Sequence, residues 1–540
     1  MRRWVGLVLG VAIIGACAGG NDGGSAEGDG TAPDGTGATT STAPKPRQGG
    51  VLRVGVGRPA TLDPAEASAS DQSELVAVDL LFDSLTTMAP DAVSATPSLA
   101  ERWTPSADLK VWTFTLRTGS RFGNGRAVTA TDVKYSLERV AKHGAASLTA
   151  TRLDLVTGWQ AFVDGTAAEL AGVRVVNDRT VEIDLDTALS VLPELLSNPL
   201  FGVVPREAVE AAAPAFGASP IGSGPFRITG RDGDVIHMVR ASPGRALLDG
   251  IDLHVYDSLD SAYDTFTAGK LDWSPVPTAR AAEAADAYGV DGFVPFAADL
   301  YFAFNLVNPK FAEVRFRQAI VKAVDRQALA NAVYLGRGTV LSGVVPDGVP
   351  GHVADACGDP CAFNVDAAKA LVVAVFPGGG VPEVQLDYYE GTTEDAVAGI
   401  IEADLEAVGI PAAKRVHTFD EYQTFVTSGQ EELFLLGWVG VYQLPDAYLG
   451  PLFTTGSRDN VTGFADAGVD QLLASARAST DPAARQRAYE QAERAILGFA
   501  PLVPLIQFET HSVVADRVQD LVVGVGGTFA GESVWVTDGD

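Results

Sequence analysis

Positive charge is scarce in this 540-residue sequence, which holds 39 lysine and arginine residues against 68 aspartate and glutamate residues. The formal net charge of −29 repels nucleic acid and anionic lipid, so both are disfavoured as partners. Common signatures of enzyme active sites are absent as well: no Gly-x-Ser-x-Gly, His-Glu-x-x-His or phosphate-binding loop occurs. We therefore expect a protein that is not an enzyme and that binds no nucleic acid.

Residues that bind metals are sparse too. The six histidines are scattered singly, and the three cysteines include one close pair, Cys357 and Cys361. A metal cage needs several such ligands at close spacing, so we expect no metal and no other cofactor. A close cysteine pair in an exported chain is typical of a local disulfide. The alternative interpretation is half of a zinc site, with His352 nearby.

No apolar run reaches the roughly 20 residues that a membrane-spanning helix needs. The short run Trp4–Ile14 follows Arg2 and Arg3, as in a signal peptide, and it leads into Ile-Gly-Ala-Cys17. That ending resembles a bacterial lipobox. The resemblance implies a signal peptide at residues 1–16, cleavage before Cys17, and a lipid on Cys17; an ordinary signal peptide with an incidental cysteine is the alternative.

Residues 17–48 hold almost no large apolar side chain and are mostly Gly, Ser, Thr, Ala, Asp and Pro. Such a segment cannot bury enough surface to offset its ordering entropy, so we expect a disordered tether. The remainder has a globular composition, with 46% hydrophobic and 20% charged residues in the whole chain.

Helix and strand patterns alternate along the body without a fixed repeat. Residues 111–117 alternate as a half-buried strand does, and 131–141 have helical periodicity. Helical patterns dominate the second half, for example at 482–498. Strand patterns near 502–508 and 513–515 suggest that the chain returns to an early sheet. The pattern indicates α/β lobes, and the length is too great for one ordinary domain.

Several segments resemble, in order, the family 5 solute-binding proteins of bacterial ABC importers, which include dipeptide, oligopeptide and nickel binders. The segments are Thr61-Leu-Asp-Pro, Pro97-Ser-Leu-Ala-Glu-Arg-Trp, Trp112-Thr-Phe-Thr-Leu-Arg-Thr-Gly, Pro220-Ile-Gly-Ser-Gly-Pro-Phe, Tyr301-Phe-Ala-Phe-Asn and Gly437-Trp. The resemblance spans about residues 50–535. Within it, Gly222 and Gly224 predict a place where the backbone passes close to another segment.

The resemblance implies an α/β, two-lobe periplasmic-binding-protein-like fold of type II, with an extra subdomain and a two-strand hinge. Lobe I would span 49–300, with the inserted subdomain at about 75–218, and lobe II would span 301–505. Residues 506–540 would return to lobe I. The expected role is an extracytoplasmic monomer, anchored to the cell membrane by lipid, that captures a peptide or peptide-like solute for an ABC permease and its ATPase.

The resemblance also indicates where a ligand would bind. Ser70, Asp71 and Gln72 follow the first strand, where relatives line the cleft, although a solvated helix start is the alternative. Asn305 stands next to the expected hinge and would order either ligand or backbone.

The segment that begins at Gly437 carries, in peptide-binding relatives, an aspartate that pairs with the ligand's ammonium group. Here the aligned residue is Val441, which cannot pair with a cation. Trp438 and Tyr442 are candidate cleft aromatics, with the core of lobe II as the alternative, and Asp446 is the nearest carboxylate. Three other functions therefore stay open: binding of a non-peptide solute such as a glycan or metal chelate, a sensor or adhesion lipoprotein, and a secreted hydrolase.

Overall fold

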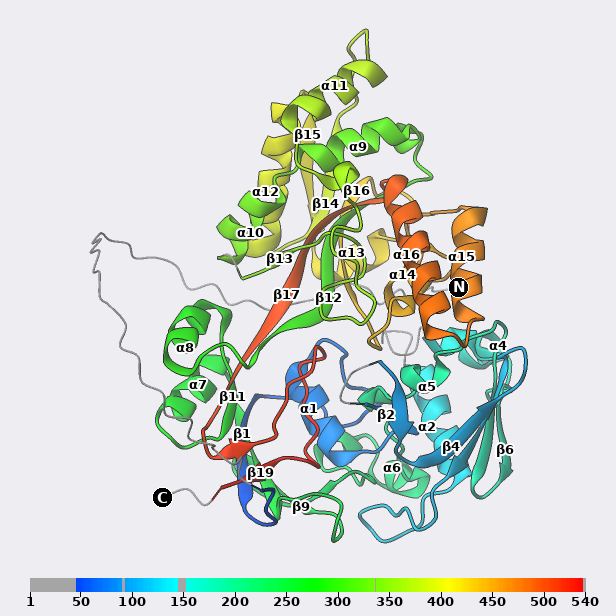
Figure 1. Cartoon of the computed structure of the whole chain (residues 1–540), viewed down its shortest axis with the longest axis vertical. Helices are drawn as coiled ribbons and strands as arrows, with labels where there is room; N and C mark the ends of the chain where they lie inside the picture. The colour runs from blue at the N-terminus through cyan, green and yellow to red at the C-terminus, as the bar shows by residue number, and fades with distance from the viewer. Residues whose placement is uncertain (1–44, 90–92, 144–151, 336, 538–540) are drawn as a thin grey trace, which may run out of the picture.

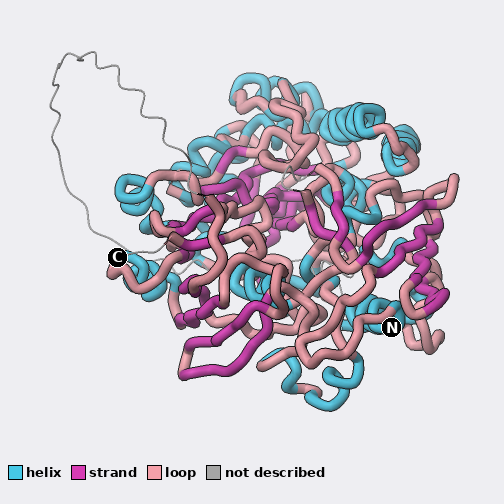
Figure 2. The backbone as a smooth tube through the Cα atoms, turned by 60° about the horizontal axis from the view of Figure 1, so that its bottom comes forward, coloured by secondary structure: helices cyan, strands magenta, loops and turns pink. Residues whose placement is uncertain are grey.

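The computed structural model describes residues 45–89, 93–143, 152–335 and 337–537. The predicted signal peptide, the predicted lipidation site Cys17 and all but the last four residues of the predicted tether lie outside these ranges. The described chain forms two lobes joined by long strands (Figure 1). Most helices lie around the strands rather than between them (Figure 2). No helix in the described ranges is long and apolar enough to cross a membrane.

Lobe I is built on a sheet of five strands in the order β11-β1-β10-β9-β8. Strand β1 pairs in parallel with β10 along its whole length, from Val51 opposite Gly250 to Gly57 opposite Tyr256. The elements of this lobe are β1 (Val51–Gly57), α1 (Gln72–Leu81), β8 (Phe226–Asp232), β9 (Val235–Arg240), β10 (Gly250–Tyr256), α7 (Leu259–Thr267), β11 (Trp273–Pro275), α8 (Ala281–Tyr288), β18 (Val518–Gln519) and β19 (Trp535–Val536).

An inserted subdomain follows α1 and contains a second sheet, in the order β4-β5-β7-β6. Trp112, Phe114 and Leu116 alternate inward along β5, which is the period of a strand with one buried face. The elements are β2 (Thr86–Met88), β3 (Ala95–Pro97), β4 (Ala100–Pro105), β5 (Val111–Leu116), α2 (Ala130–His143), η1 (Arg152–Leu155), α4 (Trp159–Val163), β6 (Val173–Asn177), β7 (Thr180–Asp184), α5 (Leu192–Leu195), η2 (Pro199–Phe201), α6 (Arg206–Ala212) and η3 (Ala215–Ala218).

Lobe II is richer in helices, as the periodicity predicts. Helix α16 begins with Asp481 as its N-cap and Pro482 in its first turn, the arrangement that best suits a helix start. The elements are η5 (Pro309–Phe311), α9 (Val314–Ala323), α10 (Arg326–Tyr334), β13 (Thr339–Val340), η6 (Asp359–Cys361), α11 (Val365–Val375), β14 (Val384–Tyr389), α12 (Thr392–Ala407), β15 (Ala412–His417), α13 (Phe419–Phe425), β16 (Leu433–Val439), α14 (Asp446–Phe453), α15 (Ala467–Arg477) and α16 (Pro482–Gly498).

Two long strands connect the lobes, β12 (Phe293–Phe304) and β17 (Leu502–Val514). The C-terminal part of β17 pairs with β11 of lobe I, whereas its N-terminal part pairs with β12 inside lobe II. Strand β12 continues into lobe II and pairs there with β16. The strands of both lobes are thereby hydrogen-bonded in one continuous order, and two strands cross between the lobes (Figure 1).

Both lobe boundaries predicted from the sequence fall within the crossing strands. Residue 300 lies within β12 and residue 505 lies within β17, so each predicted lobe boundary falls inside a strand that belongs to both lobes. The two late strand patterns, near 502–508 and 513–515, are parts of the single strand β17. That strand reaches the lobe I sheet, where it pairs with β11.

Hydrophobic packing binds the inserted subdomain to lobe II. One continuous cluster of buried side chains runs from the subdomain, for example Phe114 and Leu195, into lobe II, for example Tyr448 and Ile496. A separate cluster, which includes Leu52 and Ile251, fills lobe I beneath α1. Burial of apolar area is the main favourable term in folding, so the shared cluster holds the subdomain against lobe II.

Cys357 and Cys361 are joined by a disulfide bond that encloses a very short loop. Lys322 and Arg326, one on each of the neighbouring helices α9 and α10, donate hydrogen bonds to carbonyl oxygens of this loop. Closing so short a loop removes little chain entropy, so the bond fixes the loop locally.

The segment containing Gly222 and Gly224 passes against the end of α1. The N–H of Gly224 donates to the carbonyl oxygen of Leu81 at 2.9 Å. A Cβ atom at either glycine would collide with the backbone of Leu81, which confirms the close approach expected from the sequence.

Gly222→Ala should therefore destabilise the protein by about 1–3 kcal/mol, because the obstacle is backbone that cannot move aside like a side chain. Chemical denaturation measures the change. Gly230→Ala is the matched control, since a Cβ there meets nothing within 4 Å. Equal losses of stability in the two variants would contradict the steric explanation.

Candidate functional site

A large cavity lies between the inserted subdomain and lobe II. Its volume is about 1830 Å³, above the roughly 300–1,000 Å³ of sites for drug-sized ligands. One wall is formed by residues within 154–164 together with Asp186, and the other by residues within 305–309, 427–431 and 456–463. A solute in this cavity would touch both parts of the molecule.

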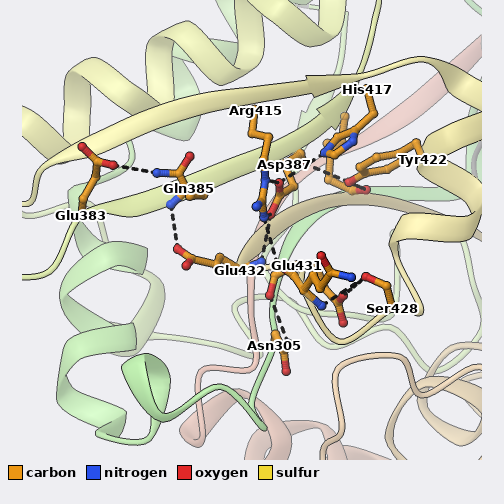
Figure 3. A network of polar contacts seen from close by, with 12 residues as sticks. Asn305, Glu383, Gln385, Asp387, Arg415, His417, Tyr422, Ser428, Glu431 and Glu432 are labelled. Carbon is orange, nitrogen blue, oxygen red and sulfur yellow. Dashed lines mark hydrogen bonds and ion pairs between the residues drawn. The ribbon is translucent and has the colours of Figure 1, made fainter.

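The lobe II wall is positioned by a polar network around Asp387 on β14 (Figure 3). Asp387 is fully buried, and both of its carboxylate oxygens accept hydrogen bonds from Arg415. The N–H of Glu432 donates to Oδ2 of Asp387 at 2.9 Å, and Tyr422 donates to its carbonyl oxygen at 2.9 Å. Buried charge is stable only when paired and hydrogen-bonded, so this network fixes the loop before β16.

Asn305 is the predicted ligand residue that lies in this wall. Its side-chain Nδ2 donates to the carbonyl oxygens of Gly429 at 3.3 Å and Glu431 at 3.0 Å. Its Oδ1 accepts from the N–H of Val307 at 3.1 Å. Asn305 thus orders the backbone of the cavity wall, and direct contact with a ligand stays a prediction.

The subdomain wall presents two buried polar atoms without a hydrogen-bond partner among the described residues. These are Oδ1 of Asp154 and the indole Nε1 of Trp159. The guanidinium of Arg458, from the opposite wall, lies 5.2 Å from the ring centroid of Trp159, a cation–π contact that spans the interface. Burial raises the pKa of the Asp154 carboxyl, even though arginine side chains nearby favour its charged form.

Next to the cavity, a buried ion cluster joins the same two parts of the molecule. Asp446, at the start of α14, accepts from Nε of Arg477 at 2.6 Å and lies 3.3 Å from Nη2 of Arg152 in the subdomain. The hydroxyls of Tyr442 and Tyr489 also donate to it, at 2.6 and 3.0 Å. Burial alone would raise the pKa of Asp446, but Arg477 and Arg152 hold it below its ordinary value.

Three predicted ligand residues form hydrogen bonds with other groups of the protein. Tyr442 and Asp446 bind each other, and Trp438 is buried with its Nε1 donating to the carbonyl oxygen of Ala447 at 2.7 Å. The side chains are thus occupied by protein partners, as in the alternative of a lobe II core. A ligand contact by any of the three stays a prediction.

The remaining predicted residues lie apart from the cavity. Asp71 is the N-cap of α1, where its side chain accepts from two backbone N–H groups, and Ser70 is exposed. Gln72 donates to the carbonyl oxygen of Gly527 at 2.7 Å. Val441 is buried, and its carbonyl oxygen accepts from the side chain of Asn198 at 2.7 Å. The first three match the alternative of a helix start, and their role in binding stays a prediction.

A further carboxylate, Asp299, is buried on the crossing strand β12. Its exposed fraction is 1%, and neither of its oxygens has a hydrogen-bond partner among the described residues. Burial, with a smaller contribution from the negative charge of Glu493, raises its pKa well above the ordinary value. The carboxyl is therefore held in its neutral form over a wide pH range.

Sequence reasoning missed Arg152, Asp154, Trp159, Asp299 and Arg458. A signal existed for Asp299 because it stands alone among the apolar residues of Phe-Ala-Ala-Asp-Leu-Tyr-Phe at 296–302. No such signal marks Arg152, since its partner Asp446 is 294 residues away in the chain. Among the described residues, no group of three or more His, Cys, Asp or Glu side chains could hold a metal ion.

Two lobes, two crossing strands and a partly open cavity between the inserted subdomain and lobe II define a protein that captures its ligand between domains. The model of the bacterial extracellular solute-binding proteins, family 5, matches residues 94–460. The chain belongs to this family.

Individual relatives cover nearly the whole chain. Di/tripeptide-binding protein 1 of Pseudomonas aeruginosa is 25% identical over 493 residues, covering 86% of this chain and 90% of the relative. The probable deoxycholate-binding periplasmic protein YgiS of Escherichia coli is 27% identical over 477 residues, covering 83% and 86%. The unliganded open form of MppA, the E. coli periplasmic murein tripeptide binding protein, has the same fold, with a TM-score of 0.74, 22% identity and coverage of 91% and 97%.

Asp446→Asn should destabilise the protein by about 3–5 kcal/mol, because two buried guanidinium groups would lose their shared counter-charge. Urea unfolding followed by circular dichroism measures the loss. The control is Glu210→Gln, which removes an exposed ion pair with Arg206 and should leave stability unchanged. A loss no larger than that of the control would contradict the structural importance of the cluster.

Asp299→Asn should stabilise the protein at neutral pH. The pKa of Asp299 is higher in the folded protein than in the unfolded chain. At a pH between these two pKa values, the unfolded chain binds fewer protons than the folded protein. The free energy of unfolding therefore falls as the pH rises. Asparagine cannot ionise and removes this loss. Unfolding at pH 4.5 and pH 7.5 should show an advantage of the variant that grows with pH, whereas the exposed control Asp232→Asn should show none.

Proposed function

We propose that this protein is the solute-capturing subunit of an ABC importer and that it holds a peptide or peptide-like solute between its lobes. The observation that carries the proposal is the cavity of about 1830 Å³ whose opposite walls come from the inserted subdomain and from lobe II. A ligand that touches both walls stabilises the closed arrangement because it binds that arrangement better than the open one.

The size and chemistry of the cavity suit an extended polar ligand. Its lining includes the amide side chains of Gln160 and Asn308, which keep donor and acceptor capacity, and the indole of Trp159. Amide groups match the N–H and C=O groups of a peptide backbone without requiring one particular side chain. Relatives named as di/tripeptide-binding and dipeptide-binding proteins support a peptide as the solute.

A non-peptide solute is the second candidate. Val441 offers no carboxylate for a peptide ammonium group, and the side chain of Asp446, the nearest carboxylate in the segment, is enclosed by Arg152, Arg477 and two tyrosines. A relative named as a probable deoxycholate-binding protein supports this alternative. A sensor or adhesion lipoprotein and a secreted hydrolase have no comparable observation in their favour.

The site of action proposed here is the outer face of the cell membrane. Lipid on Cys17 would anchor the chain after removal of residues 1–16, and residues 17–48 would act as a tether. Roughly thirty flexible residues have a root-mean-square reach of about 30 Å. The tether would let a monomeric binding protein reach its permease, whose ATPase drives import.

Peptide binding should appear as a thermal shift of the purified protein. Di-, tri- and tetrapeptide mixtures, deoxycholate and oligosaccharides are tested separately at millimolar concentration. A ligand at about 100 times its dissociation constant stabilises the folded state by about 2.7 kcal/mol. A shift with peptides supports the proposal, whereas a shift with deoxycholate or oligosaccharides alone would replace the peptide by a different solute.

A further inference from the structure

The charged residues that line the cavity are mostly negative. Asp154, Asp164 and Asp186 lie in the subdomain wall and Glu431 lies in the lobe II wall, whereas Arg458 is the one cation among the described lining residues. None of the four carboxylates forms an ion pair with a described residue. The lining therefore has an excess of negative charge that the protein itself does not neutralise by direct pairing.

Two of these carboxylates form the rim. Asp164 and Asp186 are exposed, and each accepts one hydrogen bond from a neutral neighbour: Gln160 at 2.9 Å and Thr157 at 2.7 Å. The nearest cation, Lys110, donates to the backbone carbonyl oxygen of Asp186 rather than to its carboxylate. Both rim carboxylates keep acceptor capacity for a ligand, since an ionised carboxylate offers about four lone-pair sites.

The third carboxylate, Glu431, is buried in the opposite wall, with an exposed fraction of 3%. Its side chain accepts from Ser428 at 3.5 Å, and burial raises its pKa. A cation beside Glu431 would offset the cost of keeping its charge out of water.

The arginines beside the cavity do not cancel this excess. Arg152 and Arg477 share the single carboxylate of Asp446, and Asp154 lies within their electrostatic reach and offsets the charge that remains. Arg458 stacks against Trp159. Asp164, Asp186 and Glu431 are thus left without a paired cation among the described residues.

Trp159 supplies a second kind of recognition group. It is 5% exposed, it lines the cavity, and its indole Nε1 has no acceptor among the described residues. A buried donor without a partner costs about 1–3 kcal/mol, which a ligand acceptor would recover. The wall thus offers an N–H donor to a ligand oxygen.

We propose that the cavity selects solutes that carry a positive charge, which Asp164, Asp186 and Glu431 stabilise from its two walls. The indole N–H of Trp159 donates to an oxygen of the same solute. This inference rests on the proposed function and specifies its substrate class: peptides with basic side chains are preferred over neutral peptides, and acidic peptides are disfavoured. A ligand whose charge is opposite to that of its site binds faster and more tightly.

The test compares three tripeptides, Ala-Lys-Ala, Ala-Ala-Ala and Ala-Glu-Ala, by titration calorimetry with the full purified protein. The lysine peptide should bind on the order of 10-fold more tightly than the neutral one, and the glutamate peptide should bind more weakly. Raising the salt concentration should shrink the difference, because charges at an exposed rim are screened.

The rim variant Asp164→Asn with Asp186→Asn should reduce the preference for the lysine peptide over the neutral one to below about 3-fold, because the second positive charge of the lysine peptide loses its carboxylate partners. Its control is Asp232→Asn with Asp286→Asn, which changes the net charge equally at exposed positions outside the cavity lining. Trp159→Phe should weaken all three peptides on the order of 5-fold, since it removes only the N–H donor. Unchanged melting temperatures exclude a folding defect.

Equal binding of the three tripeptides would overturn the charge inference while leaving peptide capture intact. A lysine preference that is the same in the rim variant and in its control would also overturn it, because the preference would then arise elsewhere. Binding of no peptide, together with binding of deoxycholate or an oligosaccharide, would instead refute the proposed function.

Discussion

The pairing of β12 with β17 is the constraint on which the rest of the structure depends. Strand β17 pairs with β11 of lobe I and with β12, and β12 pairs with β16 of lobe II, so the two lobes are held by backbone hydrogen bonds rather than by a loose linker. The cavity, the ion cluster and the shared hydrophobic cluster all lie where the inserted subdomain packs against lobe II. Strands that cross in this way permit rotation about the crossing while preserving register within each lobe.

The interface between the subdomain and lobe II combines two opposite kinds of chemistry. At Asp446 the charges are matched, since two arginines and two tyrosines surround one carboxylate and fix the neighbouring segment. In the adjoining cavity the carboxylates have no cation in contact with them among the residues that the structure describes. Matched charges hold a structure in place, whereas unmatched charges beside a cavity attract a ligand. The same interface thus serves packing and recognition at adjacent positions.

The sequence predicts local structure well and long-range contacts poorly. Helix α16 occupies the range 482–498 predicted from its periodicity, and strand β5 begins at residue 111 as its alternation predicts, because those signals lie within the elements themselves. The predicted lobe boundaries fall inside β12 and β17, since periodicity does not reveal that one strand serves two sheets. In the candidate site, Asn305 lines the cavity and its contact with a ligand stays a prediction, whereas the pairing of Arg152 with Asp446 depends on folding and leaves no local pattern.

The ladder between β12 and β17 is interrupted between Pro295 and Asp299. Within the gap, Ala297 donates its N–H to the carbonyl oxygen of Val525, from the C-terminal return, at 2.9 Å, while its own carbonyl oxygen accepts from Gly440 of lobe II at 3.0 Å. The same carbonyl oxygen also accepts from the hydroxyl of Tyr448 at 3.0 Å, so this alanine has one hydrogen bond to the C-terminal return and two to lobe II. Any rotation of one half against the other must strain or exchange these three bonds, so the backbone at Ala297 couples the C-terminal return to lobe II.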